Sequence, residues 1–273
     1  MVKKNIVITG GTDGIGLALT KQLIEKDQKV FIIGRNATKG NAILNSLKST
    51  NLEFFECDLS ELSQIRKILV TLNNIKEIDI LINNAGAIFD KRSLNNEGIE
   101  KTFFLNHMSY FVLSLGLVDK LESSNDPRII NVSSNAHKRY KIDIDDLENK
   151  NNYNGWKAYC RSKLLNIFFT YSFKEKLKTK INSNCLHPGF VNSNFGNNNK
   201  NFYRLIINIL KNLFAIESSK AALSPLNLAL NEGFKNVNGK YFFKLKEKKS
   251  SEESYNIELA NQIWNKSLEY LKL

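Results

Sequence analysis

Tyr159 and Lys163 are separated by three residues in the segment 158–166, which reads AYCRSKLLN. On a helix this spacing places both side chains on one face. A tyrosine with an ordinary pKa of ~10 is a poor base at neutral pH, and a nearby ammonium favours its phenolate form. The pair therefore predicts a group that moves a proton to or from a substrate oxygen, although such pairs also arise by chance on helix surfaces.

A second group of residues, Thr9 to Gly16, reads TGGTDGIG and follows a short apolar run. Glycines here let the backbone turn tightly and approach a pyrophosphate, and the start of a helix offers free N–H groups. The position between a first strand and a first helix makes the pattern specific. It predicts a dinucleotide site, the alternative being a glycine-rich turn without a ligand.

The glycine spacing, with threonine in front, resembles that of the short-chain dehydrogenase/reductase family. NNAG at 83–86 and HPG at 187–189 follow predicted strands, as they do in that family. Three further segments look like its retinol-dehydrogenase-like branch: 128–137 (RIINVSSNAH), 158–166, and 239–242 (GKYF) with the later Trp264. The resemblance covers nearly the whole chain.

This resemblance implies a catalytic tetrad of Asn106, Ser134, Tyr159 and Lys163. Ser134 would hold the substrate oxygen, and Tyr159 would exchange the proton. Lys163 would bond the nicotinamide ribose, and Asn106 would seat a water that relays protons. Alternation along a strand directs Ser133 and Ser134 to opposite sides, and the family spacing selects Ser134.

The residues expected to contact the cofactor lie in the glycine loop, after the strands and on the catalytic helix. They are Gly10, Thr12, Asp13, Gly14, Ile15, Gly16, Arg35, Asp58, Leu59, Asn84, Ala85, Gly86, Tyr159, Lys163, Pro188, Gly189, Val191 and Ser193. Asp58 resembles the residue that meets the adenine amino group; alternatively it caps the next helix, and it could do both.

The end of the second predicted strand bears on the choice between NAD(H) and NADP(H). An acid there binds the ribose 2′-hydroxyl of NAD, whereas the 2′-phosphate of NADP needs that acid absent and an arginine nearby. Gly34 occupies the expected acidic position, and Arg35 can bind phosphate as a planar fork. We therefore favour NADP(H), with NAD(H) as the alternative. Asp13 stands against this choice, because some NADP-preferring members carry a basic residue there.

Apolar runs and helical segments alternate along the chain. Strands are expected at 6–8, 30–33, 54–55, 78–82, 128–132 and 181–186, and helices at 14–26, 42–47, 62–72, 96–121 and 157–178. Strands without alternation indicate a parallel sheet buried on both faces. We expect a single α/β domain over 1–273, a Rossmann-type doubly wound sheet with helices on both faces. A substrate lid at about 192–216 and a C-terminal extension at about 240–273 complete it.

Composition limits the partners. The net charge of +12 comes mostly from 32 Lys against 7 Arg, accompanied by 37 Asn, which indicates base-composition bias and a solvated surface. We expect no nucleic-acid partner. Cys57, Cys160 and Cys185 are widely spaced, and no membrane span or signal peptide is evident, so we expect a cytoplasmic protein. His107 and His137 lack ligand partners at useful spacing, and no metal is expected.

Residues 201–214 read NFYRLIINILKNLF and carry apolar residues at helical spacing. By resemblance this amphipathic helix covers the active site, which favours an apolar alcohol, aldehyde or ketone, retinoid-like or lipid, as substrate. Ordinary core packing and a weak membrane-surface contact are the alternatives.

The family also implies a homodimer through the helices around Asn106 and Tyr159. Five phenylalanines there could serve core or interface equally: Phe103, Phe104, Phe111, Phe168 and Phe169. Taken together, the residues predict an NADP(H)-dependent enzyme that interconverts an apolar alcohol and its carbonyl compound by hydride transfer. The alternative is a non-catalytic NADP(H)-binding redox sensor or scaffold.

Overall fold

The computed structural model describes residues 2–189 and 217–272. Within these ranges eight strands form one sheet in the order β3-β2-β1-β4-β5-β6-β7-β8. The strands are β1 (Asn5–Thr9), β2 (Lys29–Gly34), β3 (Leu52–Glu56), β4 (Ile80–Asn83), β5 (Arg128–Val132), β6 (Asn182–His187), β7 (Tyr241–Phe243) and β8 (Lys246–Glu247). All neighbours pair in parallel except β8, which is antiparallel to β7. The predicted doubly wound α/β fold is confirmed.

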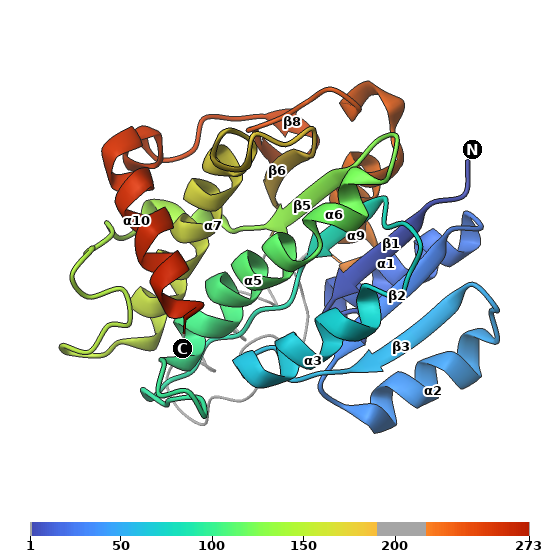
Figure 1. Ribbon diagram of the computed structural model, residues 1–273, viewed down its shortest axis with the longest axis horizontal. Helices are drawn as coiled ribbons and strands as arrows, with labels where there is room; N and C mark the ends of the chain where they lie inside the picture. Colours follow the sequence, from blue (N-terminus) through green and yellow to red (C-terminus); the bar gives the residue numbers. More distant parts are fainter. Residues whose placement is uncertain (1, 190–216, 273) are drawn as a thin grey trace.

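Helices cover both faces of this sheet (Figure 1). They are α1 (Gly14–Glu25), α2 (Ala37–Leu47), α3 (Leu62–Leu72), α4 (Lys101–Phe103), α5 (Ser109–Gly116), α6 (Val118–Glu122), α7 (Gly155–Leu177), α9 (Ser218–Leu230) and α10 (Ile257–Tyr270). Within β1, Val7 faces the core beneath α3, α5 and α7, whereas Ile6 and Ile8 face the core beneath α1 and α9. Because both faces are covered, the strand carries an unbroken apolar run.

The expectation of one helix over 96–121 is wrong at its start and in its middle. Gly98 has a φ of +78°, and residues 94 and 100 form an isolated antiparallel bridge. Helix α4 begins only at Lys101, because the Glu100 carboxylate accepts hydrogen bonds from the first free N–H groups, those of residues 102 and 103. A π-helical turn, η1 (Phe104–Met108), then precedes α5. Apolar spacing alone does not reveal these interruptions.

The segment expected as a C-terminal extension completes the fold. Strand β7 pairs with β6, and α10 packs on α7. The Trp264 ring of α10 lies 4.9 Å from the ring of Phe111 and 6.1 Å from that of Phe169, measured between centroids. The five phenylalanines that could have served core or interface are all at most 2% exposed, so within this chain they belong to the core.

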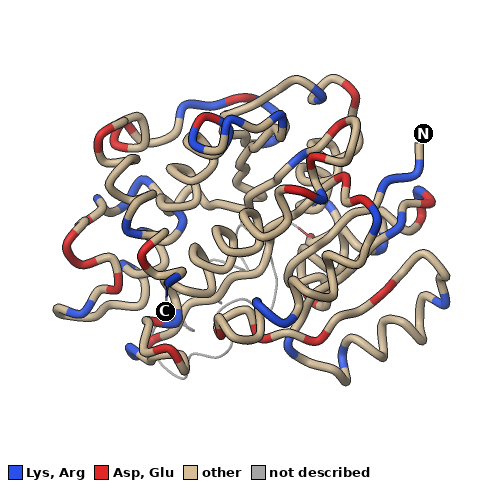
Figure 2. Tube along the Cα trace, in the orientation of Figure 1, with Lys and Arg blue, Asp and Glu red and all other residues tan. Residues whose placement is uncertain are grey.

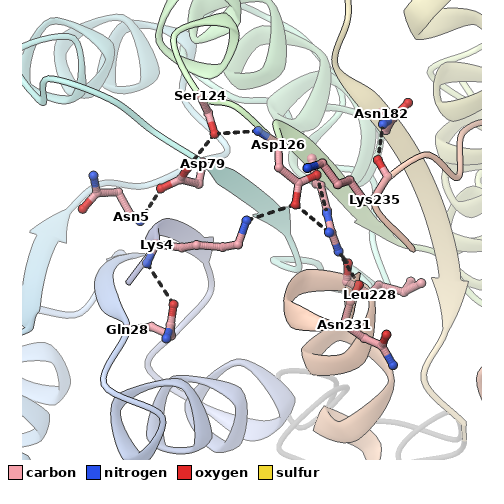
Figure 3. Close-up of polar contacts among 11 residues, drawn as sticks. Lys4, Asn5, Gln28, Asp79, Ser124, Asp126, Asn182, Leu228, Asn231 and Lys235 are labelled. Atoms are coloured by element: carbon pink, nitrogen blue, oxygen red, sulfur yellow. Dashed lines mark hydrogen bonds and ion pairs between the residues drawn. The ribbon is translucent and has the colours of Figure 1, made fainter. Parts of the chain in front are cut away.

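A buried polar cluster holds the amino ends of the strands together (Figure 3). Arg128, the first residue of β5, donates through Nε and Nη2 to both carboxylate oxygens of Asp126, at 3.0 and 2.6 Å. Its Nη1 donates to the carbonyls of Leu228 and Asn231, both at 2.9 Å. Lys4 adds a second ion pair to Asp126 at 3.0 Å. The cluster ties the starts of β1 and β5 to the end of α9.

The remaining expectations concern surface and compartment. Basic and acidic residues are both spread along the trace (Figure 2). The three cysteines are buried and free. In the described parts of the chain, no helix combines the length and apolar character needed to cross a bilayer. The expected lid at about 192–216 and the amphipathic helix expected at 201–214 both lie outside the described residues.

Candidate active site

The glycine loop joins β1 to α1 through contacts that only glycine permits. Gly10 has a φ of +68°, and a Cβ on it would lie 3.1 Å from the Ala85 backbone. A Cβ on Gly16 would collide with the Gly10 carbonyl oxygen. The first turn of α1 therefore lies directly against the loop. This is the close backbone approach that a pyrophosphate at the helix N-terminus requires.

Residues 84–86 of the NNAG segment after β4 lie against the same loop. The Thr9 hydroxyl accepts hydrogen bonds from the backbone N–H groups of Asn84 and Ala85, at 2.8 and 3.0 Å. The Asn84 side-chain amide donates to the Thr9 carbonyl at 2.9 Å. A Cβ on Gly86 would lie 3.2 Å from both Asn106 Oδ1 and Lys163 Nζ. The motif thus lines a space between the glycine loop and the expected catalytic residues, and glycine keeps that space open.

Asn106 lies in the π-helical turn, an irregularity that often marks a functional site. Its Oδ1 accepts from the Ala87 N–H at 2.8 Å, and its Nδ2 donates to the Ala87 carbonyl at 2.9 Å and to Ser162 Oγ at 3.0 Å. Its backbone carbonyl accepts from the Asn166 amide at 2.9 Å. The side chain therefore holds the loop after β4, and both its amide and its backbone carbonyl are engaged by protein partners.

Lys163 comes from α7 and is 3% exposed. Its Nζ donates to the carbonyl of Val132, the last residue of β5, at 2.9 Å. The ammonium also lies 5.4 Å from the ring centroid of Tyr110 and 5.8 Å from that of Tyr159. Tyr110 is fixed by its hydroxyl, which donates to the Ala85 carbonyl at 2.8 Å. The structure thus surrounds Lys163 with two rings and a carbonyl.

Ser133 and Ser134 follow the end of β5 and have different hydrogen-bond partners. Ser133 Oγ donates to the Lys163 carbonyl at 2.7 Å, which places it against the backbone of α7. Ser134 Oγ accepts from the Ala136 N–H at 3.2 Å and hydrogen-bonds with the Tyr159 side chain. The structure therefore brings together Ser134, Tyr159 and Lys163.

The protonation states differ from the sequence expectation. Burial raises the pKa of Tyr159 well above its usual value, and the hydrogen bond with Ser134 offsets this only in part. Burial also lowers the pKa of Lys163 to about 7. The neighbouring ammonium was expected to depress the tyrosine pKa, but the loss of hydration of both groups is the larger effect. Near neutral pH Tyr159 is accordingly a protonated phenol.

The end of β2 offers no acidic side chain. A Cβ on Gly34 would lie 2.9 Å from the Thr12 hydroxyl, so a larger residue would have to displace that side chain. Arg35 follows and is exposed. Nearby, Lys39 forms a 2.6 Å ion pair with Asp13, which also accepts a hydrogen bond from the Gly14 N–H. Two cationic side chains therefore follow the end of β2 closely.

Asp58 does not cap α3, so that part of the sequence interpretation is wrong. Its Oδ1 accepts from the N–H and hydroxyl of Ser60, at 2.9 and 2.8 Å, and closes a local turn. The first N–H groups of α3 instead bond the carboxylate of Glu97, which arrives from a distant loop. Leu59 is buried. Asp58 is half-buried after β3, where an adenine contact was expected.

The segment after β6 is described only in part. Pro188 and Gly189 follow the strand, and Gly189 has a φ of +97°. Val191 and Ser193 lie outside the described residues. Across 2–189 and 217–272, no cluster of three or more histidine, cysteine, aspartate or glutamate side chains suits a metal ion.

Three residues near the site were not assigned functional roles from sequence. Tyr110 lies four residues after Asn106. The Trp156 ring stacks on the Tyr159 ring, with centroids 5.7 Å apart and planes 24° from parallel. His137 lies three residues after Ser134 and contacts its carbonyl. Each follows or precedes a motif residue by one helical turn, and that spacing is the signal that could have found them.

The chain is similar to characterised proteins over most of its length. A family model described as short chain dehydrogenase matches residues 4–203. Polyprenol dehydrogenase of Homo sapiens is 32% identical over 96% of this chain and 83% of its own. Retinol dehydrogenase 12 of Bos taurus is 33% identical over 98% of this chain and 86% of its own.

Solved structures show the same fold. An uncharacterized protein from Mycobacterium paratuberculosis superposes with a TM-score of 0.80 at 24% identity, covering 99% of this chain and 94% of that one. The NADP complex of RhlG from Pseudomonas aeruginosa gives a TM-score of 0.70 at 24% identity, covering 88% and 94%. At these identities the structures establish the architecture alone.

Proposed function

The chain belongs to the short-chain dehydrogenase family, and from that premise we propose that it is an NADP(H)-dependent oxidoreductase that interconverts an apolar alcohol and its aldehyde or ketone. Its full-length relatives include enzymes named for retinol and polyprenol. The observation that carries the proposal is the convergence of Tyr159, Ser134 and Lys163 beside the open glycine cradle.

NADPH, when bound, supplies the hydride for carbonyl reduction. Gly10 and Gly16 fit such a cofactor, because the absence of their Cβ atoms lets the loop pack against the start of α1, whose free N–H groups would hold the phosphates. Ser134 holds the substrate oxygen. Tyr159 is protonated at neutral pH, since burial raises its pKa further above the ordinary value, so it can deliver that proton to the same oxygen. Lys163 lies beside both and orients the ribose through its remaining N–H bonds.

The preference for NADP(H) rests on the end of β2. Gly34 carries no acid to bind a 2′-hydroxyl, and a larger residue there would have to displace the Thr12 side chain, while the exposed Arg35 can bind a 2′-phosphate. The acidic Asp13 is the sequence feature that disfavours NADP(H). Its carboxylate forms a 2.6 Å ion pair with Lys39, which offsets its negative charge. Arg35→Ala should raise the KM for NADPH at least about tenfold and leave that for NADH unchanged. Lys67→Ala, on an exposed face of α3, is the control.

The apolar substrate is supported by the side chains around the tyrosine. Tyr159 belongs to a small apolar cluster with Ile88, Ala136 and Cys160, and the half-buried Trp156 packs against it. A polar carbonyl substrate would find few hydrogen-bonding partners on this wall. Cys160 is part of the packing, and burial raises its pKa to about 12, so it is not a nucleophile.

The test is oxidation of NADPH and NADH, followed by absorbance, with a panel of apolar aldehydes that includes retinal. Wild type, Tyr159→Phe and Tyr140→Phe are compared, because Tyr140 is an exposed tyrosine outside the site. We expect NADPH-dependent turnover in wild type and Tyr140→Phe, and a loss of about 10²–10⁴-fold in Tyr159→Phe. Cofactor binding without turnover in any of the three would favour the sensor or scaffold interpretation.

A further inference from the structure

His137 occupies an unusual position between the active site and the C-terminal segment. It lies in the short 3₁₀-helix η2 (Asn135–Lys138) and is 0% exposed. Its Nδ1 lies 2.6 Å from the Ser134 carbonyl oxygen, and its Nε2 lies 3.0 Å from the backbone nitrogen of Ser251. The second contact joins residues 114 positions apart in the sequence.

These partners define which ring nitrogen carries the proton. The Ser251 backbone N–H can only donate, so Nε2 must accept. In the neutral ring the other nitrogen then bears the hydrogen, and Nδ1–H donates to the Ser134 carbonyl. Burial lowers the pKa of His137 to about 4, which keeps the ring neutral over the ordinary working range of pH.

Hydrogen bonds to both the carbonyl and the hydroxyl of Ser134 hold this residue within one turn. Its carbonyl accepts from the His137 ring and, at 3.1 Å, from the His137 backbone N–H. Its hydroxyl accepts from Ala136 and reaches Tyr159. The Tyr241 ring of β7 packs edge-on against the imidazole, with centroids 5.0 Å apart, and limits its rotation. The ring therefore links the backbone that carries the Ser134 hydroxyl to β7 and to Ser251.

We propose that His137 is a positioning residue for the reaction, acting through its hydrogen bond to the Ser134 carbonyl. This inference rests on the proposed function. A hydroxyl that holds a reacting oxygen must stay in place to within a fraction of an ångström, and a misplacement of about 1 Å can cost about 100-fold in rate. Without the imidazole, the η2 turn keeps only its local backbone bonds.

Three substitutions separate the two contacts. In His137→Asn the amide nitrogen falls near the position of Nδ1 and can donate to Ser134, but the side chain does not reach Ser251. In His137→Gln the longer side chain can accept from Ser251 through its oxygen. His137→Ala has neither contact. Ser251→Ala is the matched control, because its backbone N–H remains and its buried hydroxyl has no hydrogen-bond partner among the described residues.

The experiment measures kcat, KM, the Kd for NADPH and the melting temperature of these variants with the best apolar aldehyde. We expect His137→Ala to lower kcat at least about tenfold while the Kd for NADPH stays within about twofold, because Ser134 contacts the substrate and not the cofactor. His137→Asn should recover most of kcat and His137→Gln much less. Ser251→Ala should behave like wild type.

If the losses of kcat in the Ala, Asn and Gln variants simply follow their losses of melting temperature, His137 only packs. Wild-type turnover in His137→Ala alongside a loss in Ser134→Ala would overturn the inference and leave the proposed function standing. An absence of turnover in wild type would overturn both.

Discussion

Strand β5 has a buried cation at each end, and the two cations have very different partners. Arg128 begins the strand and is 2% exposed; Lys163 bonds its last carbonyl and is 3% exposed. Arg128 makes four hydrogen bonds, two of them to the carboxylate of Asp126 (Figure 3). Among the described residues, Lys163 has a carbonyl and two aromatic rings but no carboxylate within 4 Å.

The difference distinguishes a fully paired buried charge, which is structural, from a buried charge without a counter-ion among the described residues, which we propose is functional. A buried charge with a full set of partners stabilises a local arrangement, and breaking the pair is costly. A buried ammonium without a counter-ion is costly in itself, and this shows in its lowered pKa. Such a group is retained where a reaction needs it. The starts of β1 and β5 are thus held by ion pairs, whereas Lys163 at the carboxyl end of β5 has no such pair among the described residues.

The largest effect is expected from removing the functional cation. Lys163→Met should lower turnover by about 10²–10⁴-fold, because the ammonium that organises Tyr159 and the ribose is lost. The melting temperature should change by only a few degrees, since no carboxylate is left unpaired. Lys176→Met, exposed in the last turn of the same helix, should leave both unchanged. Steady-state kinetics and thermal unfolding measure the two quantities.

Arg128→Met should produce the reverse pattern. It leaves the Asp126 carboxylate buried with Lys4 as its remaining cationic partner, and we expect the free energy of unfolding to fall by about 3–5 kcal/mol. Turnover per folded molecule should not change. Denaturant titration measures the loss, and Asp126→Asn added to the same chain should return part of it. A loss of activity without a loss of stability would contradict the division of roles.

The buried groups at the two ends of β5 should also change the unfolding free energy in different pH windows, one alkaline and one acidic. An unfolded lysine is protonated below pH ~10.4, whereas folded Lys163 has a pKa of about 7 and is protonated only below it. Between these values the unfolded chain holds more protons, so the Lys163 contribution to the unfolding free energy rises with pH. The slope is at most about 1.4 kcal/mol per pH unit. Subtracting the Lys163→Met curve from that of wild type isolates this slope.

Asp126 gives a pH dependence of the same sign in an acidic window, because its folded pKa is lowered as well. Burial alone would raise its pKa, but the hydrogen bonds and charges of Arg128 and Lys4 outweigh burial and hold the pKa below its usual value. Its contribution is therefore present above ~3.9 and is lost as pH falls through the folded pKa. Comparing wild type with Asp126→Asn between pH 6 and pH 2 checks the sign. A difference that grows as pH falls would contradict it.

The smallest effect is expected at Lys4. Its side chain is 12% exposed and its ion pair with Asp126 spans 3.0 Å. Lys4→Met should cost about 1–2 kcal/mol, less than Arg128→Met, because Arg128 still pairs with the carboxylate and water reaches this side of the cluster. Denaturant titration of Lys4→Met, Arg128→Met and the double variant gives the coupling between the two cations. A cost equal to that of Arg128→Met would remove the distinction between them.

Much of the architecture could be read from residue patterns. The bounds of β5 and α3 agree with the expected 128–132 and 62–72. The prediction of one helix over 96–121 is wrong, because the turn at Gly98 and the Glu100 cap interrupt an otherwise continuous apolar pattern. The expected cap at Asp58 failed because its place is taken by Glu97, from another loop. Local periodicity carries no information about such partners.

The glycine loop and the Tyr159–Lys163 spacing follow from local geometry, and local geometry is written in the sequence. The tertiary structure alone decided the protonation of Tyr159, the carbonyl and rings around Lys163, and the contact of His137 with Ser251. These depend on burial and on residues distant in the chain. The same holds at the other end of the sheet, where the carboxylate of Asp126 acquires its partner Lys4, the residue just before β1, only after the chain has folded.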